Sequence, residues 1–284
     1  NNRYPDTRMG VEQVLIDAFT RAKDYKKEWA EYNATKEKLV KEKKPLTGLQ
    51  IPRRDLELDA LVEVMDKKRF ITCHSYVQSE INAMMKVGDR FGFTVNTFTH
   101  ILEGYKVADK MKAHGANVST FSDWWNYKME VVDAIPYNAN IMHKVGLNVA
   151  INSDDAEMAR RLNQEAAKSV KYGGMSEDEA WKMVTINPAK MMHVDGKVGS
   201  IKIGKDADLV VWSDNPLSIY AKAEKTMVDG IVYFDRDKDA AMRIQNKNER
   251  ARLIQKLTIA KRTATPGAAG GGVGRGARPR FEII

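Results

Sequence analysis

A strand followed by a helix recurs four times between residues 69 and 195, and this alternation constrains the fold more than any other feature. Each repeat opens with a short strand-like run: RFITC, FGFTVNTFT, ANVST and LNVAINS. Helical segments follow, and glycines at Gly115 and Gly146 stand where two of them would end. Strands that alternate with helices form parallel sheets with helical crossovers. The sequence therefore predicts an α/β fold, either an open doubly wound sheet or a (β/α)₈ barrel.

Composition narrows these choices. With 284 residues, 43% of them hydrophobic, the chain can bury the core of one large domain or two small ones. No glycine fingerprint of the form G-x-G-x-x-G follows any of the strands, which argues against a dinucleotide-binding sheet. No apolar run reaches the roughly 18 residues of a membrane span. Cys73 is the only cysteine, so an intramolecular disulfide is excluded.

The net charge of +8 is concentrated in two stretches, residues 21–44 and 243–262. We do not identify either stretch as a surface that stacks on nucleic acid bases. We interpret both as solvent-exposed helix faces and do not favour nucleic acid as a partner.

Changes in residue composition and predicted structure divide the chain into four segments. Residues 1–68 are charged and helical and lead into the strand–helix repeats of residues 69–195. Residues 196–240 contain short β-strands separated by Gly and Asp turns. Residues 241–284 form a basic helix and a tail rich in Gly and Arg. The tail has too few large apolar side chains to order itself, so we expect it to be flexible.

Polar side chains stand at the ends of three strands. Strict alternation predicts three sets that each share a face: Phe70, Thr72 and His74; Thr94, Asn96, Phe98 and His100; Asn148, Ala150, Asn152 and Asp154. In a barrel, the last inward-facing residue of each strand lies at the rim where active sites are built. Two imidazoles and a carboxylate together suit a divalent metal, zinc first.

Each of these residues also has a simpler interpretation when it is taken alone. A single strand-end histidine is commonly a hydrogen-bonded structural residue, and an aspartate before a helix is commonly an N-cap. We assign that capping role to Asp155. The joint occurrence of His74, His100 and Asp154 at three strand ends favours the metal site.

Four segments of the sequence resemble, in order, the second half of an amidohydrolase of the imidazolonepropionase and metal-dependent prolidase branch. They are ITCHSY, NTFTHILEG, GLNVAINSDD and TINPAKMMHVDGKVGSIKIGKDADLVVWSDNPL. The resemblance covers about residues 69–234, and its last segment is the most specific. It implies that residues 69–195 are strands 5–8, the C-terminal half of a distorted (β/α)₈ barrel. It further implies that residues 196–240 belong to a small β-sandwich, and that the stretch before residue 69 is an insertion after barrel strand 4.

The resemblance also implies roles for the site residues. His74 and His100 correspond to metal ligands, and Asp154 to a ligand that also takes a proton from metal-bound water. One or two divalent ions, zinc first, are implied as cofactor. The implied reaction is hydrolysis of C–N bonds in cyclic amides or in peptide and imino-acid substrates. Trp124, Trp125 and Tyr127 follow the third strand, where they either line the substrate pocket or form a hydrophobic lid packed on the insertion.

One departure from the family pattern shapes the expectations about partners. No two of the five histidines are spaced as the family's first-strand H-x-H, and its bridging lysine has no counterpart here. We therefore expect the N-terminal portion of the same protein to supply barrel strands 1–4 and the H-x-H ligands. The alternatives are a non-catalytic amidohydrolase-like subunit that serves as a binding or assembly scaffold, and an unrelated barrel enzyme without metal. The resemblance favours the bacterial periplasm or cell envelope, although no residue fixes the compartment.

Overall fold

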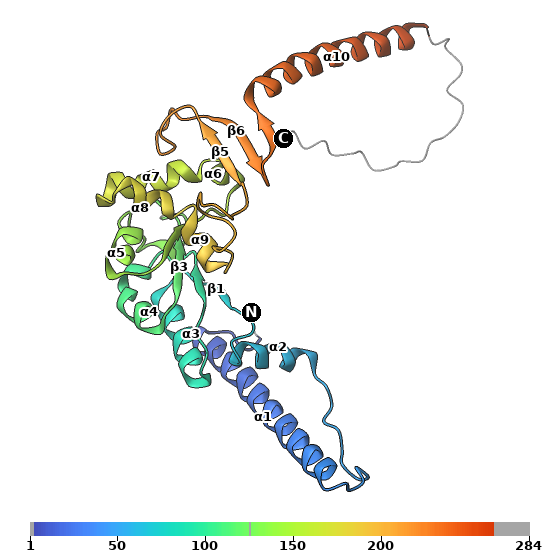
Figure 1. Ribbon diagram of the computed structural model, residues 1–284. Coiled ribbons are helices and arrows are strands. Elements are labelled where there is room, and N and C mark those ends of the chain that lie inside the picture. Colours follow the sequence, from blue (N-terminus) through green and yellow to red (C-terminus); the bar gives the residue numbers. More distant parts are fainter. Residues whose placement is uncertain (1–2, 125, 264–284) are drawn as a thin grey trace. The chain divides into compact units, whose positions relative to one another are not determined.

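The computed structural model describes residues 3–124 and 126–263. The chain divides into two compact units, which are described separately (Figure 1). The first comprises the residues up to Asp208 together with Trp212–Lys222, and the second comprises Leu209–Val211 and the residues from Ala223 onward.

A four-stranded sheet organises the first unit. Its strands are parallel and lie in chain order: β1 (Thr72–His74), β2 (Thr97–Thr99), β3 (Asn117–Thr120) and β4 (Val149–Ile151). Helices separate consecutive strands, as the alternation in the sequence requires (Figure 1). The predicted α/β class with parallel strands is confirmed, and the sequential strand order is that of part of a barrel.

The helices of this unit lie between residues 8 and 191. They are α1 (Arg8–Lys41), α2 (Leu56–Met65), α3 (Gln78–Phe91), α4 (Ala108–His114), α5 (Asn138–Val145), α6 (Ala156–Ala159), α7 (Leu162–Gly173), α8 (Glu177–Lys182) and α9 (Ile186–Met191), with single 3₁₀ turns η1 (Gly104–Lys106) and η2 (Met129–Val131). Gly115 and Gly146 end α4 and α5 in the left-handed conformation, with φ of 85° and 91°. Asp155 caps α6 by accepting the backbone N–H groups of Glu157 and Met158.

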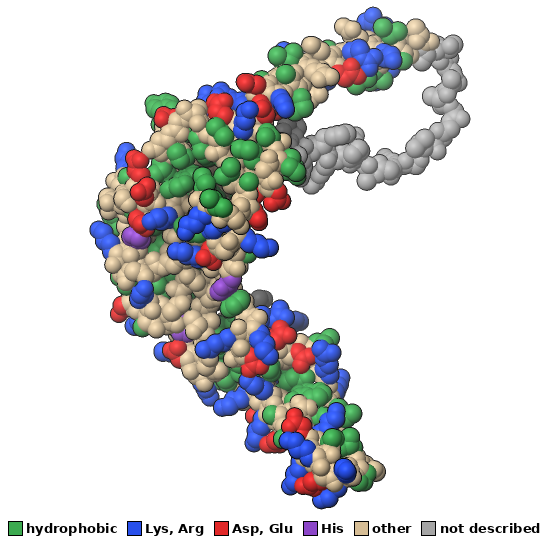
Figure 2. All heavy atoms as spheres, in the orientation of Figure 1, with side chains coloured by type: hydrophobic (Ala, Val, Ile, Leu, Met, Phe, Trp, Pro, Cys, Tyr) green, Lys and Arg blue, Asp and Glu red, His purple; other side chains and the backbone are tan. Residues whose placement is uncertain are grey.

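The hydrophobic core lies between the sheet and the helices that cover its outer face. Ile71 and Cys73 of the β1 segment, Phe98, Val118, Val149 and Ile151 all belong to this one cluster. Helix α1 joins it through Phe19, whose ring lies 4.6 Å from that of Phe93 and 5.5 Å from that of Phe91. Phe19, Ala22 and Tyr25 of α1 are buried, and the rest of the helix carries many charged side chains interspersed with exposed hydrophobic ones (Figure 2).

Strand β2 departs from the predicted alternation. In the parallel register Thr97 and Thr99 lie beside Thr72 and His74, whereas Phe98 lies beside Cys73. Phe98 therefore faces the helices and is fully buried, and the prediction that it shares a face with His100 is wrong. The reason is that the strand ends at Thr99 and His100 adopts a left-handed conformation with φ of 62°, which breaks the two-residue period.

The two edges of the sheet differ. At β4, the outward-directed backbone groups are bonded within the chain: Asn187 Nδ2 donates to the Val149 carbonyl at 2.8 Å, and the Ile151 N–H donates to the Met183 carbonyl at 3.1 Å. At β1, Ile71 and Ser75 bond to β2, so the intervening Thr72 and His74 turn their backbone groups to the other side. There the His74 carbonyl accepts the Cys73 thiol at 3.9 Å, a weak contact.

The second unit contains a three-stranded sheet in the order β5 (Leu209–Trp212), β6 (Ala223–Val228) and β7 (Ile231–Asp235), followed by α10 (Arg236–Thr263). Strands β6 and β7 form an antiparallel hairpin. Asp229 and Gly230 occupy its turn with φ of 51° and 77°, the conformation of a tight hairpin turn. Helix α10 contains the predicted basic stretch and has no buried residue, while the predicted flexible tail at residues 264–284 lies outside the described residues. In the described ranges 3–124 and 126–263, no helix has the length and apolarity needed to cross a membrane.

Candidate active site

Two histidines from neighbouring strands meet at the carboxyl ends of β1 and β2. The ring centroids of His74 and His100 are 4.7 Å apart at an interplanar angle of 67°. His74 is the last residue of β1 and its side chain is exposed, while His100 directly follows β2 and is half-buried. The two residues that were predicted as metal ligands are therefore neighbours in the fold.

His100 reaches this position through its left-handed backbone. A non-glycine residue in this region costs about 1–3 kcal/mol, and such conformations cluster at functional sites. The ring stacks on Phe121 with centroids 4.7 Å apart and an interplanar angle of 12°. Its Nδ1 lies 2.5 Å from Nδ2 of Asn152. Burial, followed by the nearby His74 and Lys128, lowers the pKa of His100, although Asp154 acts in the opposite direction. The lowered pKa favours the neutral imidazole that ligates metals.

Asp154 follows β4 by three residues and is exposed. Its charge opposes the lowering of the His100 pKa and contributes to the raised pKa of Tyr127. Asp155, not Asp154, serves as the N-cap of α6. Asp154 is therefore left at the rim, where a carboxylate can act as a ligand or as a base.

An aromatic row extends from the imidazoles into the loop after β3. Trp124 stacks on Phe121 at 4.4 Å and meets Tyr127 edge to face at 5.6 Å. The Trp124 indole N–H also contacts the sulfur of Met158 in α6. Trp125, which was predicted with these residues, lies outside the described residues. Trp124 and Tyr127 are thus part of the wall that continues from His100.

Three residues that the sequence did not single out complete this wall: Phe121, Tyr76 and Lys128. The Tyr76 ring lies edge to face with His74 at 4.8 Å, and the Lys128 ammonium lies 3.9 Å from the centre of the Tyr76 ring. Partial burial and a hydrogen bond with Tyr76 raise the pKa of Tyr127. Tyr76 could have been recognised, because it follows His74 by two residues and so continues the same face.

Buried charges hold the loop after β3 against α7. Glu165 is almost fully buried and bonds to the Ser122 hydroxyl and, at 2.8 Å, to Lys168. Lys168 also pairs with Asp123 at 2.8 Å. Burial alone would lower the pKa of Lys168, but its bonds to Asp123 and Glu165 outweigh that effect and raise it. This network fixes the start of the loop that carries Trp124 and Tyr127.

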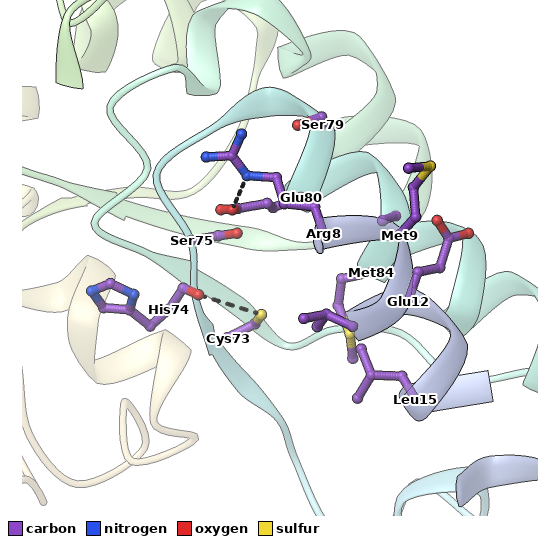
Figure 3. A pocket seen from close by; sticks show the side chains of 12 residues that line it. Arg8, Met9, Glu12, Leu15, Cys73, His74, Ser75, Ser79, Glu80 and Met84 are labelled. Atoms are coloured by element: carbon purple, nitrogen blue, oxygen red, sulfur yellow. Dashed lines mark hydrogen bonds and ion pairs between the residues drawn. The ribbon is translucent and has the colours of Figure 1, made fainter. Parts of the chain in front are cut away.

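A cavity of about 360 Å³ lies beside β1, between the first turns of α1 and α3, and His74 is among the residues that line it (Figure 3). Arg8 of α1 and Glu80 of α3 pair across it at 2.7 Å. Cys73, Leu15 and Met84 lie on one side of β1, whereas the His74 ring points away from them (Figure 3). Burial raises the pKa of the Cys73 thiol, which makes a reactive thiolate unfavourable here. The imidazoles, and not this cavity, therefore define the candidate active site.

The residues at the carboxyl ends of the strands supply some, but not all, of the ligands that a metal ion needs. Neutral imidazoles are favoured ligands of zinc and related ions, and two of them converge here. Within residues 3–124 and 126–263, however, no group of three or more His, Cys, Asp or Glu side chains is arranged to hold a metal ion. The described residues thus supply two imidazoles and a nearby carboxylate, and a complete coordination shell requires further ligands.

The family model described as the amidohydrolase family matches residues 27–234, which is most of the chain. The chain belongs to the amidohydrolase family. The match includes the whole parallel sheet and the strands up to β7.

Individual relatives and solved structures agree with this assignment. A crystal structure of an amidohydrolase from Thermotoga maritima MSB8 superposes with a TM-score of 0.69 and 29% identity, covering 81% of this chain and 57% of that one. The amidohydrolase tasK of Hapsidospora irregularis is 29% identical over 186 residues, or 64% of this chain. A 5-methylthioadenosine/S-adenosylhomocysteine deaminase of Thermoanaerobacter pseudethanolicus is 36% identical over 80 residues, or 25% of this chain. The match spans only 19% of the length of each of these two curated relatives.

Proposed function

We propose that this chain is the C-terminal part of a metal-dependent amidohydrolase that hydrolyses C–N bonds with a metal-activated water. The observation that carries the proposal is the meeting of His74 and His100 at adjacent strand ends, with ring centroids 4.7 Å apart. Family membership supports a hydrolase, and the two imidazoles supply the ligand type that zinc prefers.

Each rim residue has a distinct part in this proposal. His74 and His100 would hold a divalent ion, zinc first. When bound, such an ion polarises a carbonyl oxygen and lowers the pKa of water to about 7. Asp154 would accept a proton from the attacking water and return it to the leaving nitrogen. The exposure of Asp154 supports this role, because a proton acceptor must reach the substrate side of the rim.

The remaining ligands would come from the N-terminal portion of the same protein. We propose that it pairs with the β1 edge through the backbone groups of Thr72 and His74 and brings an H-x-H pair to the rim. The burial pattern of β1 supports this, since Thr72 and His74 are exposed whereas Cys73 between them packs on the core. At the other edge, strand pairing with β4 would require the Met183 and Asn187 bonds to open.

The substrate class follows from the wall of the rim. Trp124 and Tyr127, which continue the aromatic row from His100 through the buried Phe121, offer apolar surface that suits cyclic amides or peptide and imino-acid bonds flanked by apolar groups. Trp125 belongs to the same loop and is included in this proposal by sequence alone.

The test uses the complete protein, with the sequence upstream of this chain included. Its zinc content is measured by elemental analysis, and hydrolysis is assayed on a panel of Xaa-Pro dipeptides and cyclic amides. We expect bound zinc and turnover of at least one class, both lost in His74→Ala. A folded complete protein that binds no divalent metal would overturn the proposal and favour the non-catalytic scaffold.

A further inference from the structure

We propose that Asn152 is a positioning residue that holds His100 in the tautomer with its hydrogen on Nδ1, so that Nε2 keeps a free lone pair for a ligand. The inference rests on the proposed function, because it assigns Nε2 of His100 as the nitrogen that faces the metal. Asn152 itself is proposed neither to bind the metal nor to react with the substrate.

The geometry places the Asn152 amide on one nitrogen of the ring. Its terminal amide group lies 2.5 Å from His100 Nδ1. Asn152 directly follows β4, and its backbone N–H donates to the Thr120 carbonyl at 3.0 Å, so its position is set by the sheet. The Phe121 ring stacks on one face of the imidazole. Of the two ring nitrogens, Nε2 is the one that the amide leaves available.

The Asn152 amide can place either its nitrogen or its oxygen on His100 Nδ1, and the two orientations imply different tautomers of the ring. With Nδ2 toward the ring, Oδ1 of Asn152 is buried and has no hydrogen-bond partner among the described residues. The oxygen and nitrogen of an amide are nearly the same shape, and turning the group exchanges them. After that exchange Oδ1 accepts the Nδ1–H of His100 and the amide Nδ2 takes the buried position that Oδ1 held, so the count of paired groups does not choose between the two orientations. We infer the orientation with Oδ1 on the ring because an Nδ2 donor would place the ring hydrogen on Nε2 and leave no lone pair there for a ligand. An imidazole that donates from Nδ1 has its lone pair on Nε2.

This arrangement is the one that a ligating histidine needs. Metal-bound imidazoles commonly donate their second N–H to an oxygen, which fixes the tautomer and the ring orientation. The need is greater at His100 than at His74, because the left-handed backbone of His100 lies outside the regular strand that directs side chains. Loss of such an outer partner typically weakens metal affinity by about 10–100-fold.

The experiment is histidine ¹⁵N NMR on the complete protein without metal, at a pH where the imidazoles are neutral. The His100 signal is assigned by its loss in His100→Gln. We expect the wild-type His100 to carry its hydrogen on Nδ1. Asn152→Leu, which cannot accept, is expected to move the population toward the Nε2–H tautomer. Asn152→Asp, which can only accept, is expected to keep Nδ1–H.

Zinc titration provides a second readout. We expect about 10–100-fold weaker zinc binding in Asn152→Leu and less than about 10-fold change in Asn152→Asp. Asn148→Asp is the matched control: Asn148 lies on the same face of the β4 segment but bonds to Asn117 and Asn187, so the His100 tautomer should not change.

Two results would overturn the inference. One is a wild-type His100 that carries its hydrogen on Nε2, a measurement that needs no variant to fold. The other is an Asn152→Leu protein with unchanged tautomer and unchanged zinc affinity. Because the tautomer is read without metal or substrate, an Nδ1–H signal in a protein that never binds zinc would overturn the proposed function alone.

Discussion

The two edges of the parallel sheet differ in how the outward backbone groups of the edge strand are hydrogen-bonded. At β4 the chain bonds its own edge, with Asn187 on the Val149 carbonyl and Met183 on the Ile151 N–H. At β1 the backbone groups of Thr72 and His74 face outward, and the inward-facing side chains of the strand are exposed. Exposed strand edges are sites where another strand can pair. The difference suggests that β1 is the edge along which this unit is extended.

Two residues of the candidate active site also divide between these two edge strands. Asp154 follows the strand whose edge is bonded, whereas His74 ends the strand whose edge is open. Both side chains are exposed, so neither contributes much to the stability of the chain itself. Substitutions at these two positions should therefore separate chemistry from folding.

The largest effect is expected for His74→Ala. Loss of one imidazole removes a ligand that no other described residue replaces, so zinc and hydrolysis should fall together to background. The change in the free energy of unfolding should stay within about 0.5 kcal/mol, because the side chain is exposed. Zinc content, turnover and a denaturant melt on the complete protein measure all three. Retained zinc would place the metal elsewhere.

Asp154→Asn is expected to have the next largest effect. The amide keeps an oxygen that can ligate but cannot take the proton of water, so turnover should fall by about 10²–10⁴-fold while zinc remains bound. Asp155→Asn is the matched control, since asparagine also caps helices well and the neighbouring carboxylate is not assigned to the chemistry. Near wild-type turnover in Asp154→Asn with zinc bound would remove Asp154 as the base.

Asn187→Leu tests the bonded edge. Asn187 is buried, and its side chain is the partner of the Val149 carbonyl. Replacing it with a side chain of similar size leaves that carbonyl unpaired, which should lower the free energy of unfolding by about 1–3 kcal/mol. Thr72→Val on the open edge is the control and should change it by less than about 0.5 kcal/mol. Equal effects at both positions would mean that the edges do not differ.

Much of this arrangement could be predicted from the sequence, and the exceptions have physical causes. The faces of β1 and β4 followed the two-residue period because these strands keep regular backbone up to the rim. The face of β2 did not, because Val95 and Phe98, three residues apart, both pack into the core, and the period is broken again at His100, whose backbone is left-handed. The helical segment after Asp155 is divided into α6 and α7 at Arg160 and Arg161.

Only the site residues that stand at the ends of strands could be predicted from the sequence. His74, His100 and Asp154 were named from their positions after strands, and the structure brings the two imidazoles together. Lys128 could not be found in this way, since the path of a loop decides that its ammonium meets Tyr76. The role of Asn187 was also hidden, because an Asn-Pro pair at the start of a helix does not reveal a bond to a strand 38 residues earlier.

The smallest effect on this chain, and the sharpest test of the open edge, is expected for Thr72→Pro. Thr72 is the first residue of β1, and proline is tolerated at the first residue of an edge strand because its N–H is not needed there. The stability of the isolated chain should change by less than about 1 kcal/mol, since the backbone of Thr72 faces away from β2. If the N-terminal portion pairs with this edge, proline removes one bond of that pairing. Leaving its partner unpaired should then cost about 1–3 kcal/mol of association. Mixing the two portions as separate polypeptides and measuring their dissociation constant tests this, with Thr72→Val as control. A dissociation constant that proline leaves unchanged would place the upstream portion somewhere other than the β1 edge.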